Sequence, residues 1–145
     1  MPAVEKVIAD LVIGVDHVGF AVQNLATSIE KWEQVFGATL HSREINQDQG
    51  VEEAMLRFSD GSQIQLLAAL NPESVIGKFL AKRGEGVQQV ALQVTNLELA
   101  TQRLTEAQIP TVYPTSKSGS NRSSINFIHP KYTGGVLIEL VQYSA

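Results

Sequence analysis

The sequence predicts an α+β fold in which two βαβββ modules follow one another along the chain. Two pairs of similar segments carry this prediction: residues 16–25 (DHVGFAVQNL) resemble residues 88–97 (QQVALQVTNL), and residues 61–67 (GSQIQLL) resemble residues 135–141 (GVLIELV). The first pair opens the two halves and the second pair closes them. We expect each half to cover one sheet face with its helix and leave the other open. The joined open faces would then form a trough in a curved mixed sheet, with the helices outside.

The first module is expected to span residues 12–70. Its first strand alternates, so that Val18 and Phe20 share an apolar face while His17 and Gly19 share the other face. A helix should follow, because Thr27-Ser28-Ile29-Glu30 has the form of a capping box and Gly37 is a favourable stop.

About three strands should complete this module. In the strand expected from Val51 to Phe58, alternation places Ala54, Leu56 and Phe58 toward the helix and leaves Glu53 and Met55 on the other side. Asp60-Gly61 is a strong hairpin signal before the strand that contains Gln65.

The second module is expected at residues 86–143, after a helical linker at 71–85 that starts at Asn71-Pro72 and ends at Gly84. Asn96 should cap a helix that runs through Ala107 and ends before Pro110. One strand is predicted before this helix, at 87–94, and three after it, at 111–113, 124–129 and 135–142. The whole chain, 1–145, is interpreted as one domain of 15.8 kDa.

Composition excludes several classes of protein. The net charge of −4 disfavours a nucleic-acid partner, because phosphate backbones favour clustered cations. The chain has no cysteine, so any metal must be held by nitrogen and oxygen atoms. The N-terminal residues resemble neither a signal peptide nor a membrane span. We therefore expect a cytoplasmic protein without a membrane partner.

Four polar side chains occupy matching positions on the first and last strands of the two modules. These candidate ligands, which could converge on one metal ion on the floor of the trough, are His17, Gln65, Gln89 and Glu139. Each also has an ordinary interpretation: a strand histidine is often a hydrogen-bonded structural residue, and a buried glutamine is often a satisfied amide. Glu139 is the strongest candidate, because burying an unpaired carboxylate within an apolar run is costly. His41 and His129 are interpreted as structural or surface residues.

The duplicated unit and these positions resemble the vicinal oxygen chelate superfamily, which includes glyoxalase I, extradiol dioxygenases and bleomycin-resistance proteins. Within it, the chain is most similar to the methylmalonyl-CoA epimerase family. Four segments carry the resemblance: 16–22 (DHVGFAV), 49–53 (QGVEE), 78–86 (KFLAKRGEG) and 125–140, which contains INFIHPK and GVLIEL. Two departures are Gln88-Gln89, where many relatives have two histidines, and an altered glycine-rich loop at 118–124.

The resemblance implies a divalent metal bound by the four candidate ligands and an acyl-CoA substrate that chelates it. The expected reaction interconverts (2R)- and (2S)-methylmalonyl-CoA through a metal-stabilised enolate, with Glu53 and Glu139 as the catalytic proton carriers. The resemblance favours Co²⁺, although a set of one imidazole, two amides and one carboxylate also suits Mn²⁺, Ni²⁺, Mg²⁺ or Zn²⁺. It also implies a homodimer.

Two other functions stay open at this point. The first is another metal-dependent enzyme of the same fold. A dioxygenase would need two histidines on iron, which Gln89 disfavours, and a glyoxalase I-like lyase would usually have an acidic ligand near position 65, where this chain has Gln65. The other is a metal-free protein that sequesters small molecules, for which a buried Glu139 would have no clear purpose.

Overall fold

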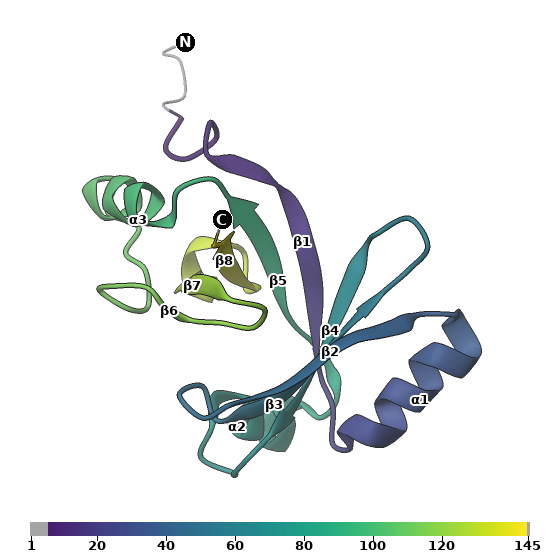
Figure 1. Cartoon of the computed structure of the whole chain (residues 1–145). Helices are drawn as coiled ribbons and strands as arrows, with labels where there is room; N and C mark the ends of the chain where they lie inside the picture. Colours follow the sequence, from purple (N-terminus) through teal and green to yellow (C-terminus); the bar gives the residue numbers. More distant parts are fainter. Residues whose placement is uncertain (1–5, 145) are drawn as a thin grey trace. The chain divides into compact units, whose positions relative to one another are not determined.

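The computed structural model describes residues 6–144, which form three α-helices, eight strands and one short 3-10 helix (Figure 1). The elements in chain order are β1 (Val12–Ala21), α1 (Leu25–Phe36), β2 (Thr39–Asn46), β3 (Val51–Arg57), β4 (Gln63–Ala69), α2 (Val75–Arg83), β5 (Gly86–Val94), α3 (Leu97–Glu106), β6 (Lys117–Ser118), β7 (Ser123–Ile128), the 3-10 helix (Pro130–Tyr132) and β8 (Leu137–Tyr143). Strand pairing is both parallel and antiparallel. The predicted α+β fold of tandem βαβββ modules is confirmed.

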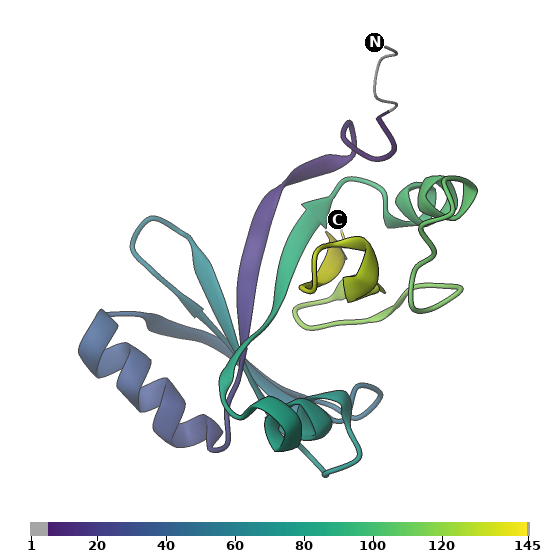
Figure 2. The same cartoon turned by 180° about the vertical axis from the view of Figure 1, so that it is seen from behind.

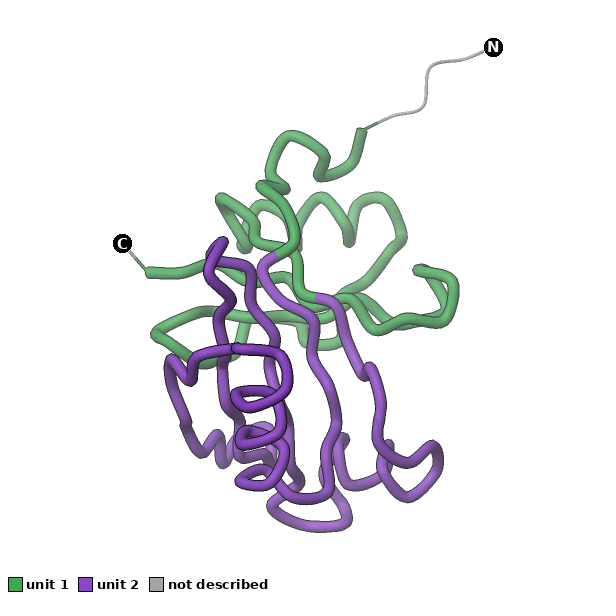
Figure 3. The backbone as a smooth tube through the Cα atoms, turned by 90° about the vertical axis from the view of Figure 1, so that its right-hand side faces the viewer, with its two compact units in different colours: residues 1–15, 91–145 green, residues 16–90 purple. Residues whose placement is uncertain are grey.

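The described chain divides into two compact units, one made of residues 16–90 and the other of residues up to 15 together with 91 onward (Figure 3). β1 and β5 contribute residues to both units. The expected module limits of 12–70 and 86–143 stay a prediction.

In the unit of residues 16–90, the strands follow the order β2-β3-β4-β1, and only β1 and β4 pair in parallel. Helix α1 lies on one face of these strands (Figure 1). Alternation puts Phe20, Ala54, Leu56 and Leu66 on that face, where they pack with Ile29 of the helix. The apolar side expected from the period of two therefore forms this core.

The opposite face of the same strands carries two of the candidate ligands, His17 and Gln65. At one end of it, helix α2 packs Ile76, Phe79 and Leu80 against Ala21, Val51, Leu67 and Ala69, so this end is apolar (Figure 2). The β3–β4 hairpin turns at Asp60-Gly61, as expected. Hydrogen bonds from the Ser62 hydroxyl and backbone N–H hold the pKa of Asp60 below its ordinary value.

In the other unit, the strands follow the order β5-β8-β7-β6. Helix α3 covers one face of them, where its residues Leu97, Ala100 and Leu104 pack with Val94 of β5 and Leu140 of β8. Asn96 caps α3 by accepting a hydrogen bond from the N–H of Leu99, as the sequence predicts. The face opposite α3 carries Ala91, Ile125 and Val141.

The structure corrects three of the expected boundaries. Helix α1 is capped by Asn24, whose Oδ1 accepts from the N–H of Thr27, so the capping box expected at Thr27 is wrong. Helix α2 is capped by Ser74 rather than starting at Asn71-Pro72. The predicted strand at 111–113 is reduced to one isolated bridge between Thr111 and Ile128, and the two-residue strand β6 follows it instead.

Within residues 6–144, no helix combines the length and the apolar character that crossing a membrane requires.

Candidate active site

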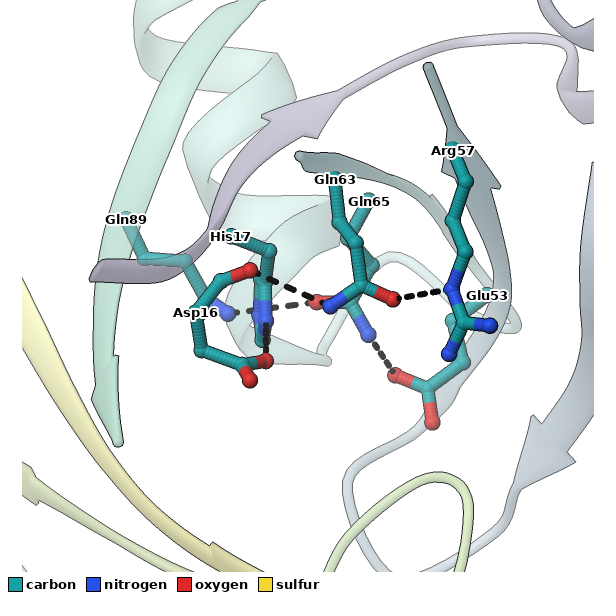
Figure 4. Close-up of polar contacts among 7 residues, drawn as sticks. All are labelled: Asp16, His17, Glu53, Arg57, Gln63, Gln65 and Gln89. Atoms are coloured by element: carbon teal, nitrogen blue, oxygen red, sulfur yellow. Dashed lines mark hydrogen bonds and ion pairs between the residues drawn. The ribbon is translucent and has the colours of Figure 1, made fainter. Parts of the chain in front are cut away.

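One face of the unit formed by residues 16–90 gathers four of the five site residues predicted from the sequence. β1 contributes His17, β3 contributes Glu53, β4 contributes Gln65 and β5 contributes Gln89 (Figure 4). All four are buried, with 2% to 8% of their surface exposed. The period of two in each strand brings them to the face opposite α1.

Hydrogen bonds join three of these side chains in a line. Gln65 donates from Nε2 to Oε2 of Glu53 at 3.0 Å, and Gln89 donates from Nε2 to Oε1 of Gln65 at 3.3 Å (Figure 4). Because an ionised carboxylate can only accept, Gln65 must turn its amide nitrogen toward Glu53 and its oxygen away from it. The charge of Glu53 thus sets the direction of Gln65.

Gly19 makes room for this arrangement. It pairs with Gln65 across the β1–β4 ladder, and a Cβ atom at position 19 would lie 2.6 Å from Cγ of Gln89. Only glycine therefore lets the Gln89 side chain lie across β1 beside Gln65. Gln88, the other half of the amide pair, points by alternation to the opposite face, so Gln89 is the member that belongs to the site.

The ring of His17 is oriented by its neighbour in the chain. Nδ1 of His17 lies 2.7 Å from Oδ2 of Asp16, and both side chains are buried, at 2% and 6% exposure. Sequence analysis missed this role of Asp16, although an acidic residue next to a candidate ligand histidine is a recognisable signal.

Glu139 lies in the other unit, on β8. It is 5% exposed, pairs in register with Phe127 of β7, and by alternation shares with Val141 the face opposite α3. Glu139 therefore holds in its own unit the position that Gln65 holds in residues 16–90. The other two histidines lie outside such a setting: His41 is exposed, and His129 caps the 3-10 helix through Nδ1.

The donor set fits a hard or borderline divalent cation. His17 offers an imidazole whose Nδ1 already faces a carboxylate, which is the usual support of a metal-binding histidine, and Gln65 and Gln89 offer amide oxygens. No group of three or more His, Cys, Asp or Glu side chains suited to a metal occurs in the described part of the chain.

Comparison with known proteins agrees with this geometry. Residues 16–127 match the model of the Glyoxalase/Bleomycin resistance protein/Dioxygenase superfamily. The crystal structure of methylmalonyl-CoA epimerase from Mycobacterium tuberculosis is 46% identical, with a TM-score of 0.90 over 100% of this chain and 94% of that chain. A Streptomyces coelicolor methylmalonyl-CoA epimerase in complex with 2-nitronate-propionyl-CoA is 35% identical, with a TM-score of 0.87 over 92% of this chain and 99% of that chain. The mitochondrial methylmalonyl-CoA epimerase of Dictyostelium discoideum is 32% identical over 93% of this chain and 82% of its own length.

Epimerases of this superfamily are typically metal-dependent. The match of residues 16–127 covers most of the sequence, and the identity to the epimerases extends over nearly all of it. The chain therefore belongs to the Glyoxalase/Bleomycin resistance protein/Dioxygenase superfamily and, within it, to the methylmalonyl-CoA epimerases.

Proposed function

We propose that the chain interconverts (2R)- and (2S)-methylmalonyl-CoA by removing the C2 proton from one face and returning a proton to the other. The observation that carries this proposal is the buried carboxylate of Glu53, held at 3.0 Å by the amide of Gln65 on the face that also carries His17. Relatives that share 46% and 35% identity with the chain are methylmalonyl-CoA epimerases, which supports this substrate.

Glu53 is the proposed base. Its carboxylate takes the C2 proton, and the electron pair of the broken C–H bond moves into the enolate of the thioester. The hydrogen bond from Gln65 Nε2 fixes one carboxylate oxygen, so the proton is taken by a group with a set direction. The apolar end of this face, where α2 covers Ala21 and Leu67, would keep water from the reacting carbon.

Glu139 is the proposed second proton carrier and also a ligand. Inversion requires a second proton carrier for the face of C2 opposite to Glu53, and the resemblance to the epimerases assigns that role to Glu139. One turnover leaves Glu53 protonated and Glu139 deprotonated, and the reverse reaction exchanges their roles.

His17, Gln65, Gln89 and Glu139 are the proposed ligands of a divalent cation, Co²⁺ by family resemblance, with Mn²⁺, Ni²⁺, Mg²⁺ or Zn²⁺ as the other candidates. When bound, such a cation supplies positive charge that offsets the negative charge developing on the thioester oxygen. Because amide oxygens are neutral ligands, we expect modest affinity, and the metal content of freshly purified protein tests the assignment.

Isotope exchange tests the function. Wild-type protein supplied with Co²⁺ in heavy water should replace the C2 hydrogen of methylmalonyl-CoA by deuterium. Glu53→Gln should slow this exchange by at least about 100-fold without lowering metal content, because it removes the base and keeps the shape of the side chain.

Glu52→Gln is the matched control. Glu52 lies next to Glu53 on the same strand but pairs with Arg43 at 3.0 Å and points to the other face. It should exchange at close to the wild-type rate. Full exchange by Glu53→Gln would remove Glu53 from the mechanism, and no exchange by metal-loaded wild type would reject the epimerase.

The chain is also proposed to form a homodimer, a prediction from family resemblance that light scattering of the purified protein checks directly. The expected cytoplasmic location stays a prediction.

A further inference from the structure

Asp16 makes a contact that the proposed reaction does not use. Its side chain is 6% exposed, and Oδ2 lies 2.7 Å from Nδ1 of His17. A carboxylate is seldom buried to this degree unless its partners are fixed, because removing a charge from water is costly. This burial next to His17 indicates a specific task.

The contact determines the tautomer of the neutral His17 ring. Since Oδ2 of Asp16 is an acceptor, the ring proton belongs on Nδ1, and the lone pair is then on Nε2. Metal-binding histidines are commonly held in this way by a carboxylate, which also makes the ligating nitrogen more basic. Asp16 thus presents His17 as a ligand through Nε2.

A second set of contacts holds the backbone of Asp16. Gln63 donates from Nε2 to the carbonyl oxygen of Asp16 at 3.1 Å, and Arg57 donates from Nε to Oε1 of Gln63 at 2.8 Å (Figure 4). Backbone pairing between β1 and β4 starts at Val18 and Ile64, so the Gln63 side chain adds a hydrogen bond between the two strands beyond the last paired residues. Arg57 and Gln63 are themselves paired across the β3–β4 hairpin.

We infer that Asp16 is a positioning residue: it fixes the tautomer and orientation of His17, and Gln63, backed by Arg57, holds the strand from which Asp16 acts. The inference rests on the ligand role proposed above for His17. The contact with His17 and the brace from Gln63 are independent, because one uses the side chain of Asp16 and the other its backbone carbonyl.

Cation binding by the full chain, titrated with Co²⁺ in a calorimeter, is the first test. Asp16→Ala should weaken binding by about 10- to 100-fold, the usual effect of losing a supporting partner. Asp16→Asn, which keeps an acceptor oxygen but loses the charge, should weaken it less. Asp10→Asn is the matched control, because Asp10 is exposed and pairs with Arg103 far along the chain, and it should bind as wild type does.

The ring proton of His17, observed by ¹⁵N NMR in metal-free protein above neutral pH, is the second test and needs no catalysis. Wild type should carry the proton on Nδ1, and Asp16→Ala should lose that preference. Unchanged Co²⁺ affinity together with an unchanged tautomer in Asp16→Ala would overturn the inference, as would a wild-type ring protonated on Nε2.

The two tests separate this inference from the proposed function. If wild type binds no cation, the proposed ligand set fails, and the NMR comparison alone decides whether Asp16 sets the tautomer. If Asp16→Ala does not fold, Asp16→Asn decides the question: loss of the charge should weaken Co²⁺ binding, and an affinity equal to that of wild type contradicts the inference.

Discussion

The amide at position 65 donates the hydrogen bond that holds the buried Glu53 carboxylate, and two substitutions of Gln65 test how much this bond contributes. Gln65→Leu removes the bond from Nε2 to Glu53 and leaves a buried carboxylate with one donor fewer. Hydrogen bonds to charged groups contribute about 1.5–3 kcal/mol, so the metal-free protein should lose about that much free energy of unfolding. The longer 3.3 Å contact from Gln89 adds little to this loss.

Gln65→Glu has nearly the same shape as the native side chain but places a second carboxylate at the 3.0 Å distance from Glu53 that the amide now occupies. Two like charges so close cannot both stay ionised, and the pair takes up a proton. Holding one proton at pH 7 against an ordinary glutamate pKa of about 4.3 costs about 3.7 kcal/mol, which is the upper limit of the destabilisation. Once protonated, the introduced carboxyl group donates to Glu53 and recovers part of the lost bond.

The pH dependence distinguishes the two variants. The folded Gln65→Glu protein binds one more proton than the unfolded chain, so its stability relative to wild type should fall by about 1.4 kcal/mol per unit as pH rises from about 5 to 7. Gln65→Leu adds no carboxyl group, so its slope should be smaller. Urea unfolding followed by circular dichroism, with a chelator present, measures both. A Gln65→Glu protein as stable as wild type at pH 7, with no added slope, would refute the reasoning.

Three further substitutions probe the site and its framework. Gly19→Ala puts a Cβ atom 2.6 Å from Cγ of Gln89. It should lower the free energy of unfolding by about 1–3 kcal/mol and weaken Co²⁺ binding. Gly14→Ala is the control on the same strand, because no atom lies within 4 Å of its added Cβ, and it should change neither quantity. Gln89→His should raise Co²⁺ affinity in calorimetry, because an imidazole is a stronger ligand than an amide; equal affinity would argue against direct ligation. Asn126 is fully buried and forms hydrogen bonds with both the N–H and the carbonyl oxygen of Tyr113. Asn126→Ala should therefore lower the free energy of unfolding by about 2–4 kcal/mol. A loss under about 1 kcal/mol would contradict this expectation.

Periodicity predicted the elements that position the site. Alternation along β1 and β3 assigned His17 and Glu53 to one face and Phe20 and Leu56 to the other, and the structure agrees because one side chain in two must face the helix. The internal repeat added Gln65 and Gln89, which no local signal would have separated from ordinary buried amides. The face that each residue occupies agrees with the structure because it depends on strand geometry, whereas the chemical roles of these residues stay predictions.

The failures lie where a side chain far along the chain replaces a backbone partner. The segment 111–113 has strand-like composition, but the side chain of Asn126 binds Tyr113 at both its N–H and its carbonyl, so no ladder forms there. Gln63 similarly substitutes for a ladder bond at Asp16. These hydrogen bonds join residues that are 13 and 47 positions apart in the sequence, so the pattern of neighbouring residues cannot predict them. The start of α1 was misplaced for a smaller reason: Asn24 and Thr27 are both acceptable caps, and the structure uses Asn24.

The direction of the amide line bears on how Gln89 could serve as a ligand. Glu53 forces the nitrogen of Gln65 toward itself, which leaves Oε1 of Gln65 facing the Nε2 donor of Gln89. A cation bound to Oε1 of Gln65 would repel that donor, so direct ligation by Gln89 requires its amide to turn over and present oxygen. Gln65 needs no such turn, because its oxygen already points away from Glu53. Binding should therefore change the hydrogen-bond partners of the Gln89 side-chain amide, whereas the bond from Gln65 to Glu53 is retained. The space beside Gly19, which already admits Gln89 across β1, is where that turn would take place.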